Sequence, residues 1–248
     1  MDNMLLLAMG LSFILSFLFA LGGVGAAIAL IPALSSFTLL PLQTIKPIAL
    51  LSNTLSMTGA TINNIKNKRL DWKAGFPIII ASMLLAPVGA YSSKFIDKNI
   101  LIFLFILFLF FSAGMMLFYK KQETYNEQPF NKLYLIGVGS FAGALSGLLG
   151  VGGGSIIMPL LAMKGYNSKK VATITAFVVP FSSFTGFLAY ISIGKLNYQY
   201  LLFCSITAFI GGAFGTIVMQ KYTKPKVVKK ILVVLLLIMA VKMISKLI

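Results

Sequence analysis

The chain contains the glycine-rich segment Leu148-Leu-Gly-Val-Gly-Gly-Gly-Ser-Ile-Ile-Met-Pro-Leu-Leu161, and 127 residues earlier it contains Leu21-Gly-Gly-Val-Gly-Ala-Ala-Ile-Ala-Leu-Ile-Pro-Ala-Leu34. At the same offset, Ser56-Met-Thr-Gly59 matches Ser183-Phe-Thr-Gly186. Two matches at one offset indicate an internal duplication rather than the chance recurrence of a motif. We therefore expect a first repeat over residues 1–120, a linker over 121–131 and a second repeat over 132–248.

The composition is that of a membrane protein. Hydrophobic residues make up 58% of the 248 residues and charged residues only 10%, whereas a soluble domain is about 45–50% apolar and about 25% charged. Because a spanning helix needs about 20 apolar residues, the sequence predicts one transmembrane domain over residues 1–248, all-α and polytopic. Ten apolar segments are expected, at residues 4–20, 24–40, 44–65, 74–93 and 99–119 in the first repeat and 132–149, 152–163, 171–192, 198–219 and 231–248 in the second.

The basic residues predict how the chain crosses the membrane. If the chain reverses at each glycine cluster, 15 of the 21 basic residues fall on one side. Basic residues concentrate on the cytoplasmic side, so we predict two inverted-topology repeats, each with a Gly-interrupted helical hairpin and three spanning helices. Both termini are then extracytoplasmic, in a cell (inner) membrane. The net charge of +16 is explained by short basic loops that meet anionic lipid headgroups, so no nucleic-acid partner is expected.

The glycine clusters and a set of uncharged polar residues are the candidate binding site for a small anion. Interrupted helices in inverted repeats place helix N-termini near the middle of the membrane, where exposed N–H groups and the helix dipole attract anions. Glycine lets a ligand approach the backbone closely. The predicted site residues are Gly23, Gly25, Asn53, Ser56, Gly152, Gly153, Gly154, Ser155, Thr175 and Ser183. The alternative is that the glycines serve helix packing and that the hydroxyls bond to their own helices.

The sequence contains few of the side chains that bind metals or transfer protons inside a membrane. The chain has no histidine, one cysteine and five acidic residues, and the acidic residues all fall in expected loops or termini. Proton relays and metal sites in membranes use Asp, Glu, His or Cys side chains. We therefore expect no enzyme activity, no metal, no cofactor, and no proton coupling through a carboxylate of the protein.

The two glycine motifs, each followed by an apolar stretch and a proline, resemble those of the sulfite exporter TauE/SafE family. The second motif, Gly147 to Pro159, matches the family well, whereas Ala26 and Ala27 stand where the family often has glycine. The resemblance covers the full chain and implies a transporter of small sulfur-containing anions, such as sulfite or organosulfonates, that exports them by alternating access. An anion channel and a non-transport subunit of a membrane complex are the alternatives. The oligomeric state is left open.

Overall fold

Helices make up nearly all of the part of the chain that the computed structural model describes, which is residues 3–118, 131–164, 166, 168–193, 196–222 and 225–245. The first repeat contributes α1 (Asn3–Gly22), α2 (Ala27–Phe37), α3 (Leu42–Lys66), α4 (Trp72–Ser92) and α5 (Lys98–Phe118). The second contributes α6 (Lys132–Leu149), α7 (Gly154–Met163), α8 (Ser168–Ile193), α9 (Tyr198–Tyr222) and α10 (Pro225–Ile244). These ranges contain no strand, which confirms the all-α prediction.

The ten helices correspond one to one to the ten predicted apolar segments. The largest difference is at α10, which begins at Pro225 rather than at residue 231. The prediction from hydropathy omitted the first turn of α10 because that turn contains lysines. Proline at position 225 is, however, common as the first residue of a helix. The predicted linker lies outside the described residues except for Asn131, whose side chain accepts a hydrogen bond from the Leu133 N–H and so caps α6.

Within the described residues, six helices are long and apolar enough to cross a membrane: α1, α4, α5, α6, α8 and α9. Helices α2 and α7 have only 11 and 10 residues. At 1.5 Å per residue they extend roughly 15 Å, about half of a hydrocarbon core of ~30 Å. The chain therefore forms a multi-pass membrane protein with two helices too short to span it.

Helix α3 is long but polar, and its position explains why. It packs against α2, α8 and α9, and Ser52, Asn53 and Ser56 on it are completely buried. Polar side chains on a central helix contact protein rather than lipid, where their cost would be high. The polar run of α3 thus belongs to the interior of the bundle.

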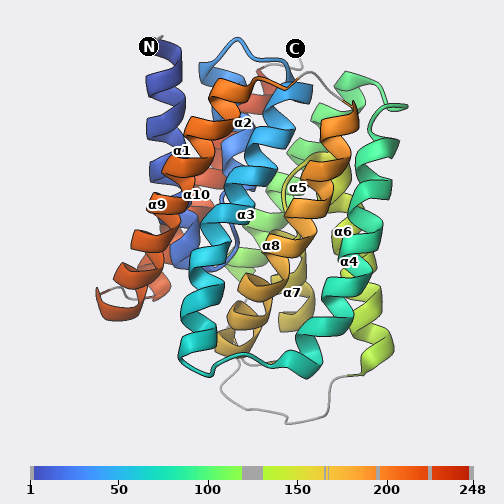
Figure 1. The fold of residues 1–248 in the computed structure, drawn as a ribbon, viewed down its shortest axis with the longest axis vertical. Coiled ribbons are helices and arrows are strands. Elements are labelled where there is room, and N and C mark those ends of the chain that lie inside the picture. Colours follow the sequence, from blue (N-terminus) through green and yellow to red (C-terminus); the bar gives the residue numbers. More distant parts are fainter. Residues whose placement is uncertain are drawn as a thin grey trace.

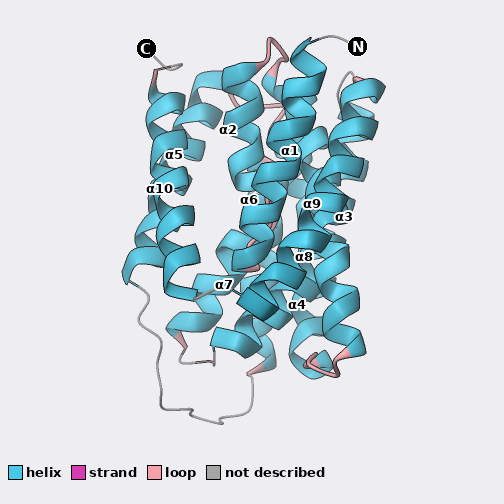
Figure 2. Cartoon of the chain, turned by 90° about the vertical axis from the view of Figure 1, so that its left-hand side faces the viewer, coloured by secondary structure: helices cyan, strands magenta, loops and turns pink. Residues whose placement is uncertain are grey.

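The helix contacts follow the same pattern in both halves of the chain. In this pattern α1 corresponds to α6, α2 to α7, α3 to α8, α4 to α9 and α5 to α10. Helix α1 packs on α9 as α6 packs on α4, and α3 packs on α9 as α8 packs on α4. Helix α2 contacts α3 and α10, and α7 contacts α8 and α5. Figures 1 and 2 show both chain ends at one end of the bundle, whereas α6 begins at the opposite end. An inverted duplication would produce this exchange of partners, and the duplication itself stays a prediction.

Glycines bring two pairs of helices into close contact. A Cβ atom at Gly139, Gly143 or Gly147 of α6 would overlap the backbone of α4, and one at Gly211 or Gly215 of α9 would overlap the backbone of α1. Small residues spaced by four allow such approach in membranes. At the positions that match Gly139 and Gly143, α1 has Ser12 and Ser16. In the α1–α9 pair, however, the glycines that allow contact are on α9.

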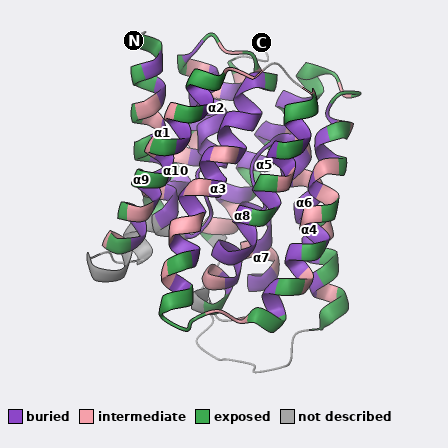
Figure 3. Ribbon diagram, in the orientation of Figure 1, coloured by how far each residue is buried: buried purple, intermediate pink, exposed green. Residues whose placement is uncertain are grey.

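The outer surface is apolar and the interior contains the polar groups. Large hydrophobic side chains such as Ile80, Leu107 and Val234 are more than half exposed. Figure 3 shows exposed residues along the outer faces of the helices and buried residues between them. A continuous apolar surface of this kind requires a lipid environment. Helices α2, α3, α7 and α8 form the centre of the bundle, which is where the candidate site lies.

Candidate functional site

Four glycines with left-handed backbone conformation break the two helical hairpins. Their φ angles are +69° at Gly23, +87° at Gly25, +79° at Gly150 and +71° at Gly152. Gly23 matches Gly150 in the repeat, and Gly25 matches Gly152. Glycine adopts such φ values readily, whereas residues with a Cβ do so at a cost. The two hairpins therefore turn with the same backbone geometry at matching positions.

The short helices α2 and α7 begin directly after these turns. Their N-cap residues, Ala26 and Gly153, make no side-chain capping hydrogen bond. The first N–H groups of a helix need a partner from outside the helix. The third N–H of each helix, at Ala29 and Ile156, bonds to the N-cap carbonyl, so the first two N–H groups are left for partners outside the helix.

Asn53 of α3 joins the two broken segments. Its Oδ1 atom lies 3.4 Å from the Ala27 nitrogen at the start of α2 and accepts its hydrogen bond. Its Nδ2 atom donates to Ser183 Oγ on α8 at 3.0 Å. A Cβ at Gly25 would overlap Asn53 Oδ1, and one at Gly152 would overlap Asn53 Nδ2. The buried carboxamide thus lies between both glycine segments, with no space to spare.

The other predicted glycines lie around this centre. A Cβ at Gly153 would be 3.5 Å from Ser182 Oγ of α8. Gly154 packs against the Val24 carbonyl, so the two glycine segments touch each other. Gly23 packs on α8, where a Cβ would lie 3.6 Å from Ala172 Cβ. The glycines therefore bring the two repeats together at the middle of the bundle.

Three predicted hydroxyls face elsewhere. Ser56 packs against Gly212 of α9, Thr175 is buried on α8, and Ser155 of α7 lines a pocket that Asn53 does not line. None of the three hydroxyls has a hydrogen-bond partner. The structure thus brings Gly25, Gly152, Asn53 and Ser183 together but places Ser56, Thr175 and Ser155 around them.

A buried lysine lies on the same face of α3, two turns before Asn53. Lys46 is the only charged side chain that is buried in the described part of the chain. Its Nζ atom donates to the Leu148 carbonyl at 2.8 Å and lies 5.6 Å from the centre of the Tyr190 ring. Tyr190 donates its hydroxyl hydrogen to the Gly147 carbonyl at 2.8 Å. Both residues donate hydrogen bonds to carbonyl groups at the C-terminal end of α6, where the helix dipole is negative.

In the described part of the chain, the buried polar side chains are uncharged apart from Lys46. Helix starts and hydroxyls supply hydrogen-bond donors, and Lys46 supplies a positive charge. The described residues contain no cluster of three His, Cys, Asp or Glu side chains. Asp71 and Asp97 lie in the connections before α4 and α5 rather than inside the bundle.

A model of the sulfite exporter TauE/SafE family matches residues 8–243, nearly the whole chain. The chain belongs to the TauE/SafE family. It is 28% identical to the probable membrane transporter protein YunE of Bacillus subtilis, over 87% of this chain and 89% of that protein. It is 33% identical to a probable membrane transporter protein of Methanocaldococcus jannaschii over 54% of this chain and 51% of that protein. No solved structure matches the chain.

In this TauE/SafE chain, sequence reasoning missed the interactions of Lys46 and Tyr190. A lysine near the start of a helix commonly extends to the membrane surface, but Lys46 is only 3% exposed. Its partner is 102 residues away in sequence, so no local pattern predicts the contact. Sequence reasoning also missed Ser112 of α5, which lines the same cavity as Ser155.

Proposed function

We propose that this TauE/SafE protein exports small sulfur-containing anions, sulfite or organosulfonates, by alternating access between its two repeats. Membership of the family supports membrane transport as the class of activity. The observation that supports an anion is the contact between Asn53 and the start of α2. A polar oxygen there occupies the position that an oxygen of a bound anion would take.

The proposed substrate seat is the space now filled by Asn53 Oδ1 at the start of α2. The bond from Ala27 N–H to Asn53 Oδ1 is long, at 3.4 Å, compared with about 2.9–3.0 Å for a common N–H···O bond. A charged oxygen accepts a hydrogen bond more strongly than an amide oxygen does. We therefore propose that an entering anion displaces Asn53 Oδ1 and is bound by the α2 start, the Asn53 amide N–H and Ser183.

We propose that the end of the bundle opposite the chain termini faces the cytoplasm of the cell. Lys66 ends α3 at that end, and Lys68 and Arg69 follow it. Lys132 begins α6 there, and Lys164 follows α7. Basic residues at a membrane surface favour the cytoplasmic leaflet and its anionic headgroups. Both termini would then be extracytoplasmic, and the proposed partners are the anion and anionic lipid.

The experiment is flux of methanesulfonate in proteoliposomes with voltage and pH gradient controlled separately. Methanesulfonate is permanently ionised and carries no proton. We expect a saturable flux that is accelerated by methanesulfonate on the opposite side. An inside-negative voltage should drive the anion outward, with about 2.3 kcal/mol per charge per 100 mV.

The outcomes separate the alternatives. Flux that rises without saturation and is not accelerated from the opposite side would indicate a channel. Accumulation of methanesulfonate driven by a pH gradient at zero voltage would contradict the absence of proton coupling. No flux of methanesulfonate or sulfite by the reconstituted protein would contradict transport of sulfur anions.

A further inference from the structure

The long helices pack as two bundles that do not coincide with the two halves of the sequence. Helices α1, α3 and α9 contact one another, and so do α4, α6 and α8. We call these sets the α1 bundle and the α6 bundle. Figure 1 shows α1 and α9 on one side, α4 and α6 on the other, and α3 and α8 between them. The two bundles are therefore the two repeats with their fourth helices, α4 and α9, exchanged.

Backbone contact holds the helices of each bundle together. A Cβ at Gly89 of α4 would overlap the backbone of α6, and one at Gly212 of α9 would overlap the backbone of α3. The glycines of α6 and α9 described above bring α6 onto α4 and α9 onto α1 in the same way. Helices in such contact have no side chains between them that could rearrange, so they resist sliding past each other.

Helix α8 is fixed to α4 at both ends of α4. Lys170 of α8 forms an ion pair with Asp71, the N-cap of α4, at 2.7 Å. The hydroxyl oxygen of Tyr190, near the other end of α8, lies 3.1 Å from Oγ of Ser93, the C-cap of α4. Helix α8 is therefore expected to move with α4 and α6 as one body.

The contact between α3 and α8 joins the two bundles and is of a different kind. A Cβ at Gly186 of α8 would meet a side chain, 3.4 Å from Leu50 Cδ1 of α3, and not the α3 backbone. Helices separated by side chains can slide by small adjustments of those side chains, which is the basis of shear movements in proteins. The α3–α8 contact is therefore the surface along which the bundles can shift.

Two polar side chains of α3 cross between the bundles on either side of Asn53. Near the start of α3, Lys46 Nζ donates to the Leu148 carbonyl of α6 at 2.8 Å. Near its end, Thr61 Oγ1 donates to the Ala176 carbonyl of α8 at 2.6 Å. Lys46 is 3% exposed and Thr61 is 7% exposed. The level of Asn53 is therefore closed by one buried bond on each side.

The two crossing bonds are unlike each other and are not repeated at the matching positions. Thr173 of α8 matches Lys46, but its hydroxyl donates within its own helix, to the Lys170 carbonyl. Leu188, which matches Thr61, has no hydroxyl. A hydrogen bond from a charged donor is stronger than one from a hydroxyl. The bond at Lys46 is therefore the harder of the two to break.

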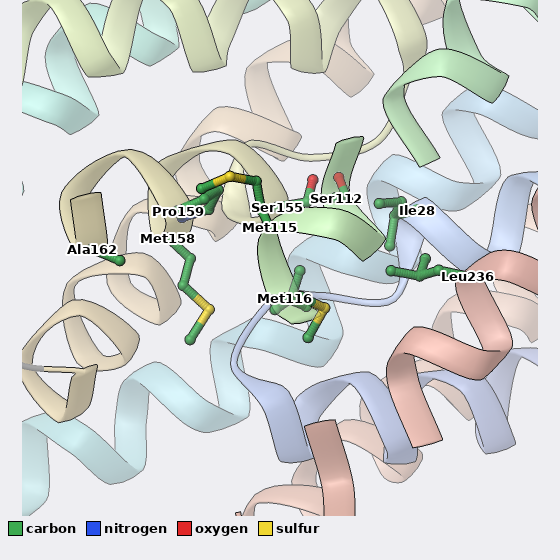
Figure 4. A pocket seen from close by; sticks show the side chains of 10 residues that line it. Ile28, Ser112, Met115, Met116, Ser155, Met158, Pro159, Ala162 and Leu236 are labelled. Carbon is green, nitrogen blue, oxygen red and sulfur yellow. The ribbon is translucent and has the colours of Figure 1, made fainter. Parts of the chain in front are cut away.

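The short helices have room to follow the bundles. A mainly apolar cavity of about 40 Å³ lies between α2, α5, α7 and α10, with Ile28, Met116, Met158 and Leu236 among its lining residues (Figure 4). Atoms beside a void lack part of their dispersion contacts, so this side of the short helices is held less firmly. Because α2 contacts α3 and α7 contacts α8, each short helix can move with its bundle.

We propose that transport occurs by sliding of the α1 bundle against the α6 bundle, with Lys46 as the extracytoplasmic gate and Thr61 as the cytoplasmic gate. The inference rests on the proposed function, because it assigns the moving parts and the gates of that alternating-access cycle. Both gates are closed over Asn53 in the structure. The stronger bond at Lys46 keeps the extracytoplasmic gate closed for longer, so an anion enters chiefly from the cytoplasm.

Crosslinks between cysteines distinguish moving bundles from moving sequence repeats. A Cβ at Gly186 would lie 3.9 Å from Ala86 Cβ in the same bundle and 3.4 Å from Leu50 Cδ1 in the other. In a Cys204→Ala background, Gly186→Cys is therefore paired with Ala86→Cys or with Leu50→Cys, and mercuric ion bridges the two thiolates. We expect the Leu50 pair to stop methanesulfonate flux until a small thiol removes the mercury. The Ala86 pair should retain most of its flux, although it joins α8 of the second repeat to α4 of the first.

Labelling from each side of the membrane tests the gates without a transported anion. Met57→Cys reports on the space between Asn53 and Thr61. Thr61→Val keeps the shape of the side chain, and it should raise cytoplasmic labelling of Met57→Cys about fivefold, the factor for one neutral hydrogen bond. Thr54→Val is the matched control, because the buried Thr54 hydroxyl donates within α3, to the Leu50 carbonyl.

The extracytoplasmic gate is tested with Leu50→Cys, which lies between Lys46 and Asn53 on α3. Lys46→Met should raise labelling of Leu50→Cys from the extracytoplasmic side about tenfold, because the lost bond has a charged donor. Lys94→Met, at an exposed position, should leave the rate unchanged. A variant whose fold is merely loosened would be labelled faster from both sides.

The results separate this inference from the proposed function. Equal loss of flux in the Ala86 and Leu50 pairs would overturn the bundles as moving parts. Faster labelling from both sides, or equal rates in Thr61→Val and Thr54→Val, would overturn the gates. If wild-type protein transports neither methanesulfonate nor sulfite, the proposed function fails, whereas the labelling rates still decide whether Lys46 and Thr61 are gates.

Discussion

The ammonium group of Lys46 lies 2.8 Å from the carbonyl oxygen of Leu148, at the end of α6. This bond connects α3 of the first repeat to the broken hairpin of the second. It places a positive charge where the negative end of the helix dipole would otherwise be buried. The contact therefore stabilises the end of α6 electrostatically, directly before the turn at Gly150 and Gly152.

Replacing this lysine by an apolar residue should destabilise the protein. Lys46→Met leaves the Leu148 carbonyl without its charged donor, and loss of such a bond removes about 1–3 kcal/mol. We expect a lower unfolding temperature in detergent. Lys94→Met is the control, because Lys94 is exposed and its loss should have little effect. Equal unfolding temperatures for the two variants would show that the Lys46 contact does not stabilise the turn.

The Asn53 carboxamide should matter more for anion binding than a buried hydroxyl on an outer helix. Asn53→Leu keeps the approximate size of the side chain but removes the acceptor for Ala27 N–H and the donor to Ser183. We expect at least about a tenfold loss of methanesulfonate flux at equal protein density. Ser12→Ala should be close to wild type. Normal transport of methanesulfonate by the Asn53→Leu variant would contradict the proposed binding site at Asn53.

Adjacent glycines should differ sharply in their tolerance of alanine. Gly152 has a φ of +71°, and its Cβ would overlap Asn53 Nδ2. Gly153 has a φ of −65°, and its Cβ would lie 3.2 Å from Ile157 Cδ1, a flexible methyl group. A left-handed conformation alone destabilises a non-glycine residue by about 1–2 kcal/mol. Gly152→Ala should therefore abolish transport and lower the unfolding temperature, while Gly153→Ala retains most activity. The reverse order would contradict the turn geometry.

The ion pair between Asp71 and Lys170, at 2.7 Å, predicts a pH dependence of stability. Partial burial raises the pKa of the Asp71 carboxyl, but the hydrogen bond from Lys170, the Ala74 N–H and the lysine charge together lower that pKa below its ordinary value. A lowered pKa in the folded state stabilises the protein above the ordinary carboxyl pKa. This stabilisation is lost as pH falls through the lowered pKa.

The variant Asp71→Asn isolates this effect, because asparagine can still cap α4. At neutral pH it should cost less than about 1 kcal/mol, the range for exposed ion pairs. Unfolding temperatures of the two proteins should converge as the solution is acidified. A difference that is independent of pH would assign the effect to the cap instead.

Cysteine labelling in a Cys204→Ala background tests the topology. Lys68 and Lys164 lie at one end of the bundle, and Asp97 lies at the other. Lys68→Cys and Lys164→Cys should react with an impermeant reagent from the cytoplasmic side only, and Asp97→Cys from outside only. Reaction of Lys68→Cys and Lys164→Cys from opposite faces would rule out the proposed hairpin at α6 and α7.

The sequence predicts the course of the helices well because that course depends on local composition. Apolar runs mark the ten helices, and paired glycines at 23 and 150 and at 25 and 152 mark the turns. The central contacts of Asn53 were partly predictable for a similar reason. Asn53 carries an amide in an otherwise apolar environment, and such a group needs partners.

The orientation of the remaining polar groups could not be predicted. Asn53 and Ser56 are three residues apart and so differ by about 60° around α3, enough to direct Ser56 toward α9 instead of the centre. Lys46 depends on carbonyl groups exposed by a break in a helix of the other repeat. Ser112 is one hydroxyl within an apolar run, and only the packing of α5 near α7 shows that it lines a cavity.

Three matched positions carry different chemistry in the two repeats. Lys46 corresponds to Thr173, Asn53 to Pro180 and Ile28 to Ser155. Two identical inverted copies would present the same affinity to either compartment. In the proposed alternating-access cycle, these substitutions would give the inward-open and outward-open forms unequal energies and unequal half-saturation concentrations. Thermodynamics still requires zero net flux at equilibrium, so such an asymmetry would make the protein a kinetic rectifier whose transport rate depends on the orientation in which it is inserted.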